Sequence, residues 1–299
     1  MKILDFIKKP ELDSYDAFLT YEIFKCDAEL CRMRKAPMLA SALHRNGIKY
    51  IRKDPKNERI ILCTKDNLLI AINDHWAIFH EIFCAKIYEL DEELANKPFA
   101  LFDLGMNRAY ASLYFSTYEN CKIIYGYEPN PTTIEFARYN LALNQEHLRS
   151  KNKIINVFEY GLGEKDGMVL LNCFANRDGI STIEGCPNSI LSKKEFKKAQ
   201  RIPVVIKSVT KEFNKRFSEI EKQNLRKIMK IDVEGAEYEI IEALCKTGQI
   251  KSFDAIIGES HNGISSIKNK LESNGFILKH LGGEKKCNDF LFVKGESMD

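Results

Sequence analysis

The chain lacks an excess of charge of either sign, and it lacks any long apolar run. Its 45 Lys and Arg residues face 42 Asp and Glu residues, and a net charge of +3 does not by itself indicate a nucleic-acid surface. The first apolar segment is interrupted by Asp5, Lys8 and Lys9, and no later segment reaches the roughly 18 apolar residues that span a bilayer. We therefore expect a cytoplasmic protein with small or weakly charged partners, no nucleic-acid partner and no membrane span.

Paired cysteines and a dinucleotide fingerprint are missing too. The nine cysteines contain no Cys-x-x-Cys pair, so they indicate reduced, mostly buried thiols rather than a zinc knuckle or a thioredoxin-like site. The pattern Gly-x-Gly-x-x-Gly is absent, which argues against a nicotinamide or flavin enzyme. The hydrophobic content of 44% nevertheless suffices for a substantial core.

Hydrophobic periodicity divides the chain near residue 95. Residues 14–44 show helical spacing, and three short strand-like segments follow at 48–51, 59–64 and 67–72. This pattern predicts a helical and small β extension over residues 1–95. The extension is open to two interpretations, a lid or a homodimer contact.

From residue 96 to 299, apolar strands alternate with helices of ten or more residues, which indicates parallel βαβ units. We predict an α/β, Rossmann-like fold with helices on both faces of a seven-stranded sheet. The expected strands are residues 99–104, 122–128, 153–160, 227–232, 255–259, 276–281 and 289–294. An insertion at 161–223 carries two more strand-like runs and is well placed to cover a pocket.

Acidic residues stand at the ends of the first two predicted strands. The first strand runs into a turn and a helix through Asp103, Leu104, Gly105, Met106 and Asn107. A ligand can approach the backbone at Gly105, and Asp103 can accept hydrogen bonds beside it. The second strand ends at Glu128, whose carboxylate can bind both hydroxyls of a ribose. Pro129 and Asn130 add helix-start chemistry, so Glu128 can also serve the following helix.

The fourth predicted strand ends in three carboxylates, Asp232, Glu234 and Glu237. They repel one another, so we expect them to meet a cation, an amino group or a hydroxyl. The fifth strand ends at Glu259 and His261, and neighbouring ends of a parallel sheet share one edge. We therefore expect His261 to lie close to Asp232, as a catalytic residue or, equally, as a structural histidine.

With these residues in place, the chain resembles the FkbM family of S-adenosylmethionine-dependent methyltransferases. The matching segments are FALFDLGMNRAYASLYFS, YGYEPNPTTIEFARYNLALN, VFEYGLGEKDGMVLL, MKIDVEGAEYEIIEAL and AIIGESH. The resemblance implies a methyltransferase sheet with S-adenosylmethionine as cofactor: its methionine moiety at the first turn, its ribose on Glu128 and its adenine near Gly161 and Leu162. It further implies that Asp232 faces the methyl-transfer site.

Members of that family are mostly O-methyltransferases acting on sugars or polyketide-type natural products, so the resemblance implies such an acceptor. The family usually has alanine and glycine where this chain has Met106 and Ala109, which makes the first loop bulkier. Ala109 fits without strain if its φ is negative.

The candidate reaction is an in-line attack of a substrate hydroxyl on the sulfonium methyl group. His261 is the preferred base, oriented by Asp232 and Glu259; alternatively, the three hold a divalent metal ion that lowers the pKa of the hydroxyl. The candidate substrate contacts are Arg177, Ser181, Thr182 and Glu234, with an ordinary surface loop as the equal alternative for the insertion residues.

Two other functions remain open at this point. Base-modifying methyltransferases place Asn/Asp-Pro-Pro-aromatic after the fourth strand, where this chain has Asp232-Val233-Glu234-Gly235, and that difference argues against a nucleic-acid substrate. A non-catalytic, Rossmann-like scaffold subunit that has lost its cofactor is supported only by the altered first loop.

Overall fold

The computed structural model describes residues 48, 50–54, 59–72, 77–174, 181–183, 198–283 and 287–295. The predicted helical segment at 14–44 and the candidate contact Arg177 lie outside these residues. The chain forms two compact units, one of residues 1–87 and 139–147, the other of residues 88–138 and 148–299. No helix among the described residues is long and apolar enough to cross a membrane.

The first unit contains an antiparallel meander of β1 (Tyr50–Lys53), β2 (Ile60–Cys63) and β3 (Leu69–Ile72), which confirms the three predicted short strands. The backbone N–H groups of Leu69 and Ala71 donate to the side-chain oxygens of Asn144 and Asn140, each at 2.8 Å. These two side-chain oxygens satisfy two backbone donors of β3. A short helix α3 (Ala77–Phe79) and a π-helical turn η3 (His80–Cys84) follow.

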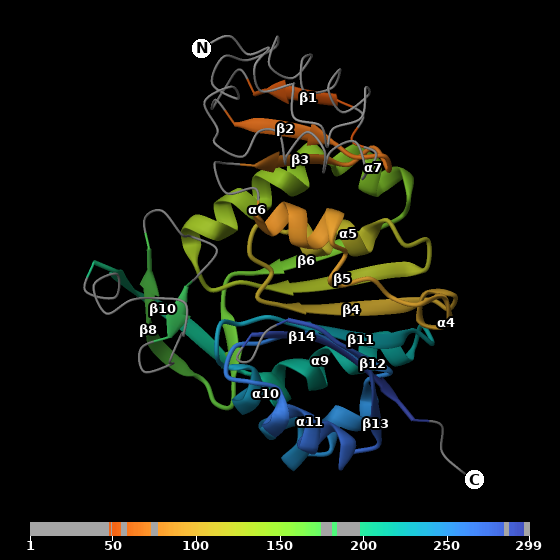
Figure 1. The fold of residues 1–299 in the computed structure, drawn as a ribbon, viewed down its shortest axis with the longest axis vertical. Coiled ribbons are helices and arrows are strands. Elements are labelled where there is room, and N and C mark those ends of the chain that lie inside the picture. Colours follow the sequence, from red (N-terminus) through yellow and green to blue (C-terminus); the bar gives the residue numbers. More distant parts are fainter. Residues whose placement is uncertain are drawn as a thin grey trace, which may run out of the picture. The chain divides into compact units, whose positions relative to one another are not determined.

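The second unit is built on a seven-stranded sheet, as predicted. Its order is β13-β14-β12-β11-β4-β5-β6, and Figure 1 shows β4, β5 and β6 lying side by side. The strands are β4 (Phe99–Leu104), β5 (Cys121–Tyr127), β6 (Ile154–Phe158), β11 (Arg226–Ile231), β12 (Ala255–Ser260), β13 (Phe276–Leu281) and β14 (Asn288–Lys294). Only β14 pairs antiparallel, with β12 and β13, while the other neighbours are parallel. The carboxyl ends of β4, β5, β11 and β12 therefore share one edge.

Helices cover both faces of this sheet. Every residue of β4 is buried, and successive side chains point to opposite faces. Phe102 packs with Phe213 of α9 (Val209–Glu221) in the core cluster, whereas the next residue, Asp103, accepts a hydrogen bond from Ser112 of α5 (Tyr110–Ser116). The remaining helices are α4 (Glu92–Ala95), α6 (Pro131–Leu143), α7 (Gln145–Ser150), α10 (Glu237–Lys246), the 3-10 helix η4 (Gln249–Ser252) and α11 (Ser265–Glu272).

The insertion forms a second, four-stranded sheet of β7 (Gly161–Gly163), β10 (Gln200–Ser208), β8 (Gly167–Cys173) and β9 (Thr182–Ile183), in that order. Its two long strands, β8 and β10, pair antiparallel and confirm the two predicted strand-like runs. Leu171, Val204 and Ile206 form a small apolar cluster on one face of it.

Candidate active site

A pocket lies beside the carboxyl ends of β4, β5 and β11 and beside β7. The pocket is lined by most of the predicted cofactor and substrate residues: Gly105, Asn107, Glu128, Pro129, Gly161, Leu162, Ser181, Asp232 and Glu234. Leu171 and Ile206 of the insertion sheet add apolar surface to this lining.

The first turn is tightly wound. Gly105 has a φ of +75°, and a Cβ at this position would overlap the backbone oxygen of Asp232. Ala109 has a φ of +65°, so the condition for an unstrained alanine is not met; the left-handed conformation costs about 1–2 kcal/mol. The bulkier Met106 lies outside the lining that the described residues form, because its buried side chain packs against Gly126 of β5.

Glu128 is fixed at the floor of the pocket. Its Oε2 accepts from the backbone N–H of Asn107 at 2.9 Å and its Oε1 from that of Asn130 at 2.8 Å. Burial raises the pKa of this carboxyl to about 7. Each oxygen keeps a second lone pair for a ligand hydroxyl. Asn130 itself is buried and donates from Nδ2 to Ser181 Oγ at 3.1 Å, so it links Glu128 to the insertion.

A buried lysine that the sequence analysis did not single out supports the first turn. Lys230 Nζ lies 3.3 Å from Asp103 Oδ1 and 3.7 Å from Asp232 Oδ2, and it donates to the Gly105 oxygen at 2.7 Å. Burial disfavours the ammonium, but the two carboxylates hold the pKa of Lys230 above its usual value. Asp103 is fully buried beneath the turn and supports it from below. The sequence feature that could have pointed to Lys230 is its position as a lysine in an otherwise apolar strand end.

A second unpredicted residue joins the acidic strand ends. The Tyr88 hydroxyl lies 3.0 Å from Asp232 Oδ2 and 3.1 Å from Glu259 Oε1. Burial and these two carboxylates raise the pKa of Tyr88 well above its usual value, so the phenol keeps its proton. Tyr88 precedes β4 in an irregular segment, so no periodicity pointed to it.

His261 lies near Asp232, as the strand-end argument predicts, with Nε2 3.9 Å from Asp232 Oδ1 and 3.5 Å from Glu234 Oε2. Its orienting partner differs from the predicted Asp232 and Glu259. The Nδ1 atom bonds Glu237 Oε1 at 2.9 Å, and the backbone N–H groups of Val233 and Gly235 in the turn after β11 donate to the same oxygen. Burial lowers the pKa of His261, but the Glu237 bond and the carboxylates of Glu234 and Asp232 outweigh it and raise the pKa to about 10. An imidazolium cannot accept a proton, so this geometry does not favour His261 as the base at neutral pH.

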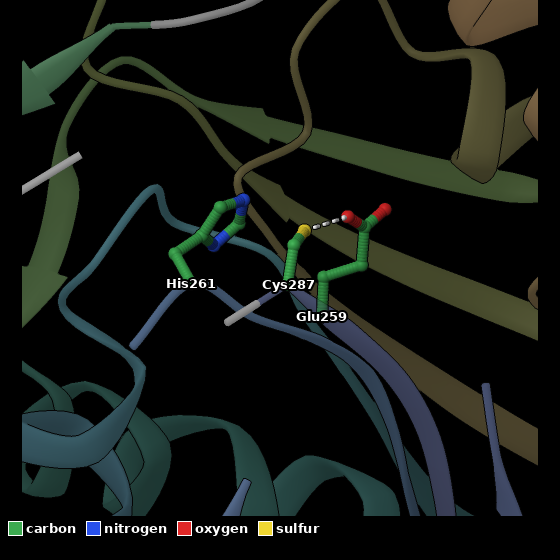
Figure 2. Close-up of side chains that lie close together, drawn as sticks. All are labelled: Glu259, His261 and Cys287. Carbon is green, nitrogen blue, oxygen red and sulfur yellow. Dashed lines mark hydrogen bonds between the residues drawn. The ribbon is translucent and has the colours of Figure 1, made fainter. Parts of the chain in front are cut away.

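Glu259 faces a cysteine. Figure 2 shows Cys287 between His261 and Glu259, and the Cys287 thiol donates to Glu259 Oε2 at 3.6 Å. Two groups of side chains bring potential ligand atoms within 4.8 Å of one another: Asp232, Glu234 and His261, and Glu259, His261 and Cys287. Either group has the donor chemistry of a metal site.

The predicted substrate contacts are only partly placed. Ser181 and Glu234 line the pocket, while Thr182 lies in β9, of which the backbone alone is described. Arg177 lies outside the described residues.

The pocket fits the expected cofactor in its chemistry. An adenosyl group needs apolar walls and an acceptor for its ribose, and the pocket offers Leu162, Leu171 and Ile206 together with the buried Glu128. A positively charged sulfonium and amino group need carboxylates, and Asp232 lines the same cavity.

Comparisons with known proteins give similarities at two levels. In fold, the chain is similar to an FkbM methyltransferase from Methylobacillus flagellatus (12% identity, TM-score 0.41, 89% of this chain and 60% of that one). It is also similar to a precorrin-6y C5,15-methyltransferase from Geobacter metallireducens (14%, 0.34, 67% and 81%) and to TrmK of M. capricolum with S-adenosyl-homocysteine (13%, 0.34, 69% and 69%).

No curated protein matches the sequence. Residues 96–290 match the family described as the methyltransferase FkbM domain, which is well over half of the chain. The chain therefore belongs to the FkbM methyltransferase family and is an S-adenosylmethionine-dependent methyltransferase.

Proposed function

We propose that this methyltransferase acts on a hydroxyl of a sugar or glycan, presented as a nucleotide-activated sugar for surface polysaccharide synthesis in the cytoplasm. The observation that carries the proposal is the character of the pocket's reacting end, where Asp232 and Glu234 face the same cavity as Glu128. Carboxylates accept hydrogen bonds from hydroxyl groups, so this end suits a polyhydroxylated acceptor. The FkbM resemblance supports an oxygen acceptor.

S-adenosylmethionine supplies an electrophilic methyl group on a sulfonium. In our proposal, the first turn at Gly105 and Asn107 holds its methionine moiety, Glu128 binds its ribose, and Gly161 and Leu162 flank its adenine. Lys230 keeps the turn in place from below through the Gly105 oxygen. These residues bind and orient, and alignment of oxygen, methyl and sulfur lowers the barrier by several kcal/mol.

The acceptor would enter beside the insertion. Ser181 and Glu234 line the pocket there, and we assign them to substrate contact, with Thr182 and Arg177 as further candidates from the same segment. Asp232 is assigned to the reacting end because it lines the cavity while its second oxygen is held by Tyr88.

The test is a transfer assay with labelled S-adenosylmethionine against nucleotide-activated sugars, soluble and lipid-linked glycans, and RNA. Cofactor binding is checked first by thermal shift, because a ligand at 100-fold over its Kd stabilises by about 2.7 kcal/mol. We expect label on an oxygen of at least one carbohydrate, and less of it with Asp232→Asn. Label on RNA alone would replace the carbohydrate proposal with the nucleic-acid alternative.

A further inference from the structure

We propose that Asp232, Glu234 and His261 bind one divalent first-row transition-metal ion at the reacting end of the pocket. Potential ligand atoms of the three side chains lie within 4.8 Å of one another. Binding of the ion follows from this geometry alone, whereas its use in methyl transfer rests on the proposed function.

The histidine is oriented as a metal ligand is. His261 Nδ1 bonds Glu237 Oε1 at 2.9 Å, and that same oxygen accepts the backbone N–H groups of Val233 at 3.1 Å and Gly235 at 3.0 Å. Metal-binding histidines typically bond a carboxylate through the other ring nitrogen, which fixes the tautomer and the direction of the ring. Glu237 thereby directs Nε2 toward Asp232 and Glu234, and a bound ion would replace the proton that Nε2 carries in the imidazolium.

The separations agree with a shared ion. Ligand atoms about 2.1 Å from one ion lie roughly 3.0–3.5 Å apart in octahedral or tetrahedral geometry. His261 Nε2 lies 3.5 Å from Glu234 Oε2 and 3.9 Å from Asp232 Oδ1. These two nitrogen–oxygen separations lie within a few tenths of an ångström of that range, and the ligand atoms of all three side chains lie within 4.8 Å of one another.

Asp232, Glu234 and His261 are more buried than an acidic cluster on the protein surface, yet two of them remain accessible from the pocket. The side chains of His261, Glu234 and Asp232 are 6%, 18% and 26% exposed, and the two carboxylates line the cofactor pocket. Glu237 and Glu259 add two more carboxylates at the same strand ends. Lys230 and the imidazolium of His261 offset part of this negative charge, and a divalent cation in place of the imidazolium proton would offset more of it.

The competing ligand group contains Cys287. Among the described residues, Asp232 and Glu234 line the cofactor pocket, whereas Glu259 and Cys287 do not, and the Cys287 thiol is bonded to Glu259 (Figure 2). The structure therefore favours one nitrogen and two oxygen ligands, a set suited to Mn²⁺, Fe²⁺, Co²⁺ or Zn²⁺.

The ion would act as a Lewis acid on the acceptor, since three protein ligands leave positions for two neighbouring hydroxyls. One hydroxyl loses its proton to solvent, its oxygen forms a bond to the methyl carbon, and the carbon–sulfur bond breaks with the electron pair left on sulfur. The acceptor class is accordingly a vicinal diol.

The experiment titrates the full chain, stripped with a chelator and free of cofactor, with Co²⁺ while the visible absorption is recorded. We expect one equivalent to bind with nitrogen and oxygen ligation. His261→Gln and Glu234→Gln should weaken binding by at least about 100-fold, and the positioning variant Glu237→Gln by about 10- to 100-fold. His280→Gln is the matched control, because His280 forms an exposed pair with Asp289 at 2.7 Å and should bind Co²⁺ as the unmodified protein does.

Absence of binding, or equal binding by the His261 and His280 variants, overturns the proposal, and a sulfur-to-cobalt charge-transfer band overturns the assigned ligands. The thermal unfolding transition of each variant, recorded with and without S-adenosylmethionine, shows whether it folds. Co²⁺ affinity is compared only among the variants that fold. Sugar methylation without Co²⁺ binding would reject the metal and keep the proposed function, whereas Co²⁺ binding with no carbohydrate methylated would do the reverse.

Discussion

Lys230 and Asp103 form a buried ion pair beneath the first turn, with Nζ 3.3 Å from Oδ1 and side chains that are 2% and 0% exposed. The pair joins β11 to β4, and the same ammonium holds the Gly105 oxygen. The turn that lines the pocket thus rests on a charge pair that solvent does not reach.

Removing the lysine should cost far more than removing a surface lysine. Lys230→Met leaves Asp103 buried without its partner and should lower the free energy of unfolding by about 3–5 kcal/mol. Lys211→Met breaks an exposed pair with Asp166 at 2.7 Å, which solvent screens, and should change the free energy of unfolding far less. Urea denaturation measures both, and equal losses would contradict the structural role of Lys230.

The backbone of the first turn should tolerate no side chain at Gly105. Gly105→Ala places a Cβ on a residue with a φ of +75° and against the Asp232 backbone oxygen. We therefore expect the free energy of unfolding to fall by more than about 2 kcal/mol and cofactor binding to weaken. Gly167→Ala is the control, since a Cβ there has nothing within 4 Å. Thermal unfolding of the two variants provides the comparison, and an unaffected Gly105→Ala protein would show that the turn relaxes freely.

Glu128 should make the stability of the cofactor-free protein depend on pH. Burial raises its pKa from 4.5 to about 7, so the folded state binds the proton more tightly than the unfolded state. Its contribution is therefore fully present below pH 4.5 and is lost as pH rises to about 7, a change of roughly 3 kcal/mol. Glu128→Gln should remove this slope from the pH series of denaturation curves, and a slope that persists would assign it to other groups.

Cofactor binding should show the opposite trend if Glu128 binds the ribose. The ionised carboxylate accepts two hydroxyls, so affinity for S-adenosylmethionine should rise as pH increases through about 7. Calorimetric titration of the unmodified protein and Glu128→Gln decides this, because the variant should bind more weakly and without this pH dependence. Equal affinities would remove Glu128 from the ribose site.

The Tyr88 hydroxyl should matter more than other tyrosine hydroxyls. Tyr88→Phe removes the donor shared by Asp232 and Glu259 and should lower the free energy of unfolding by about 1–3 kcal/mol. Tyr125→Phe loses a bond to the half-exposed Glu219 at 3.1 Å and should cost about 1 kcal/mol or less. Chemical denaturation of the pair gives the difference, and a neutral Tyr88→Phe would mean that the two carboxylates find another donor.

Much of the second unit was predictable, because periodicity and strand-end chemistry are local properties of the chain. The seven strands, their α/β alternation and the position of Asp232, Glu234 and Glu128 at one edge follow from residue order and the sharing of one edge by parallel strands. The domain boundary expected near residue 95 remains a prediction, as do the cytoplasmic location and the homodimer.

The directions of individual side chains could not be predicted from the sequence. The sequence did not reveal that Met106 packs on Gly126, that Ala109 takes a positive φ, or that Glu237 bonds His261. These depend on which rotamers and backbone angles remain once the sheet and its helices have packed.

The sequence by itself determined an α/β methyltransferase sheet with acids at its strand ends, because burial patterns and turn residues act locally along the chain. Only the tertiary structure decided which acids meet. It brought Lys230 beneath the first turn and joined Tyr88 to Asp232 and Glu259, residues separated by 144 and 171 positions. Contacts of that sequence separation depend on how strands and helices pack, and that packing gave the two halves of the pocket their different chemistry.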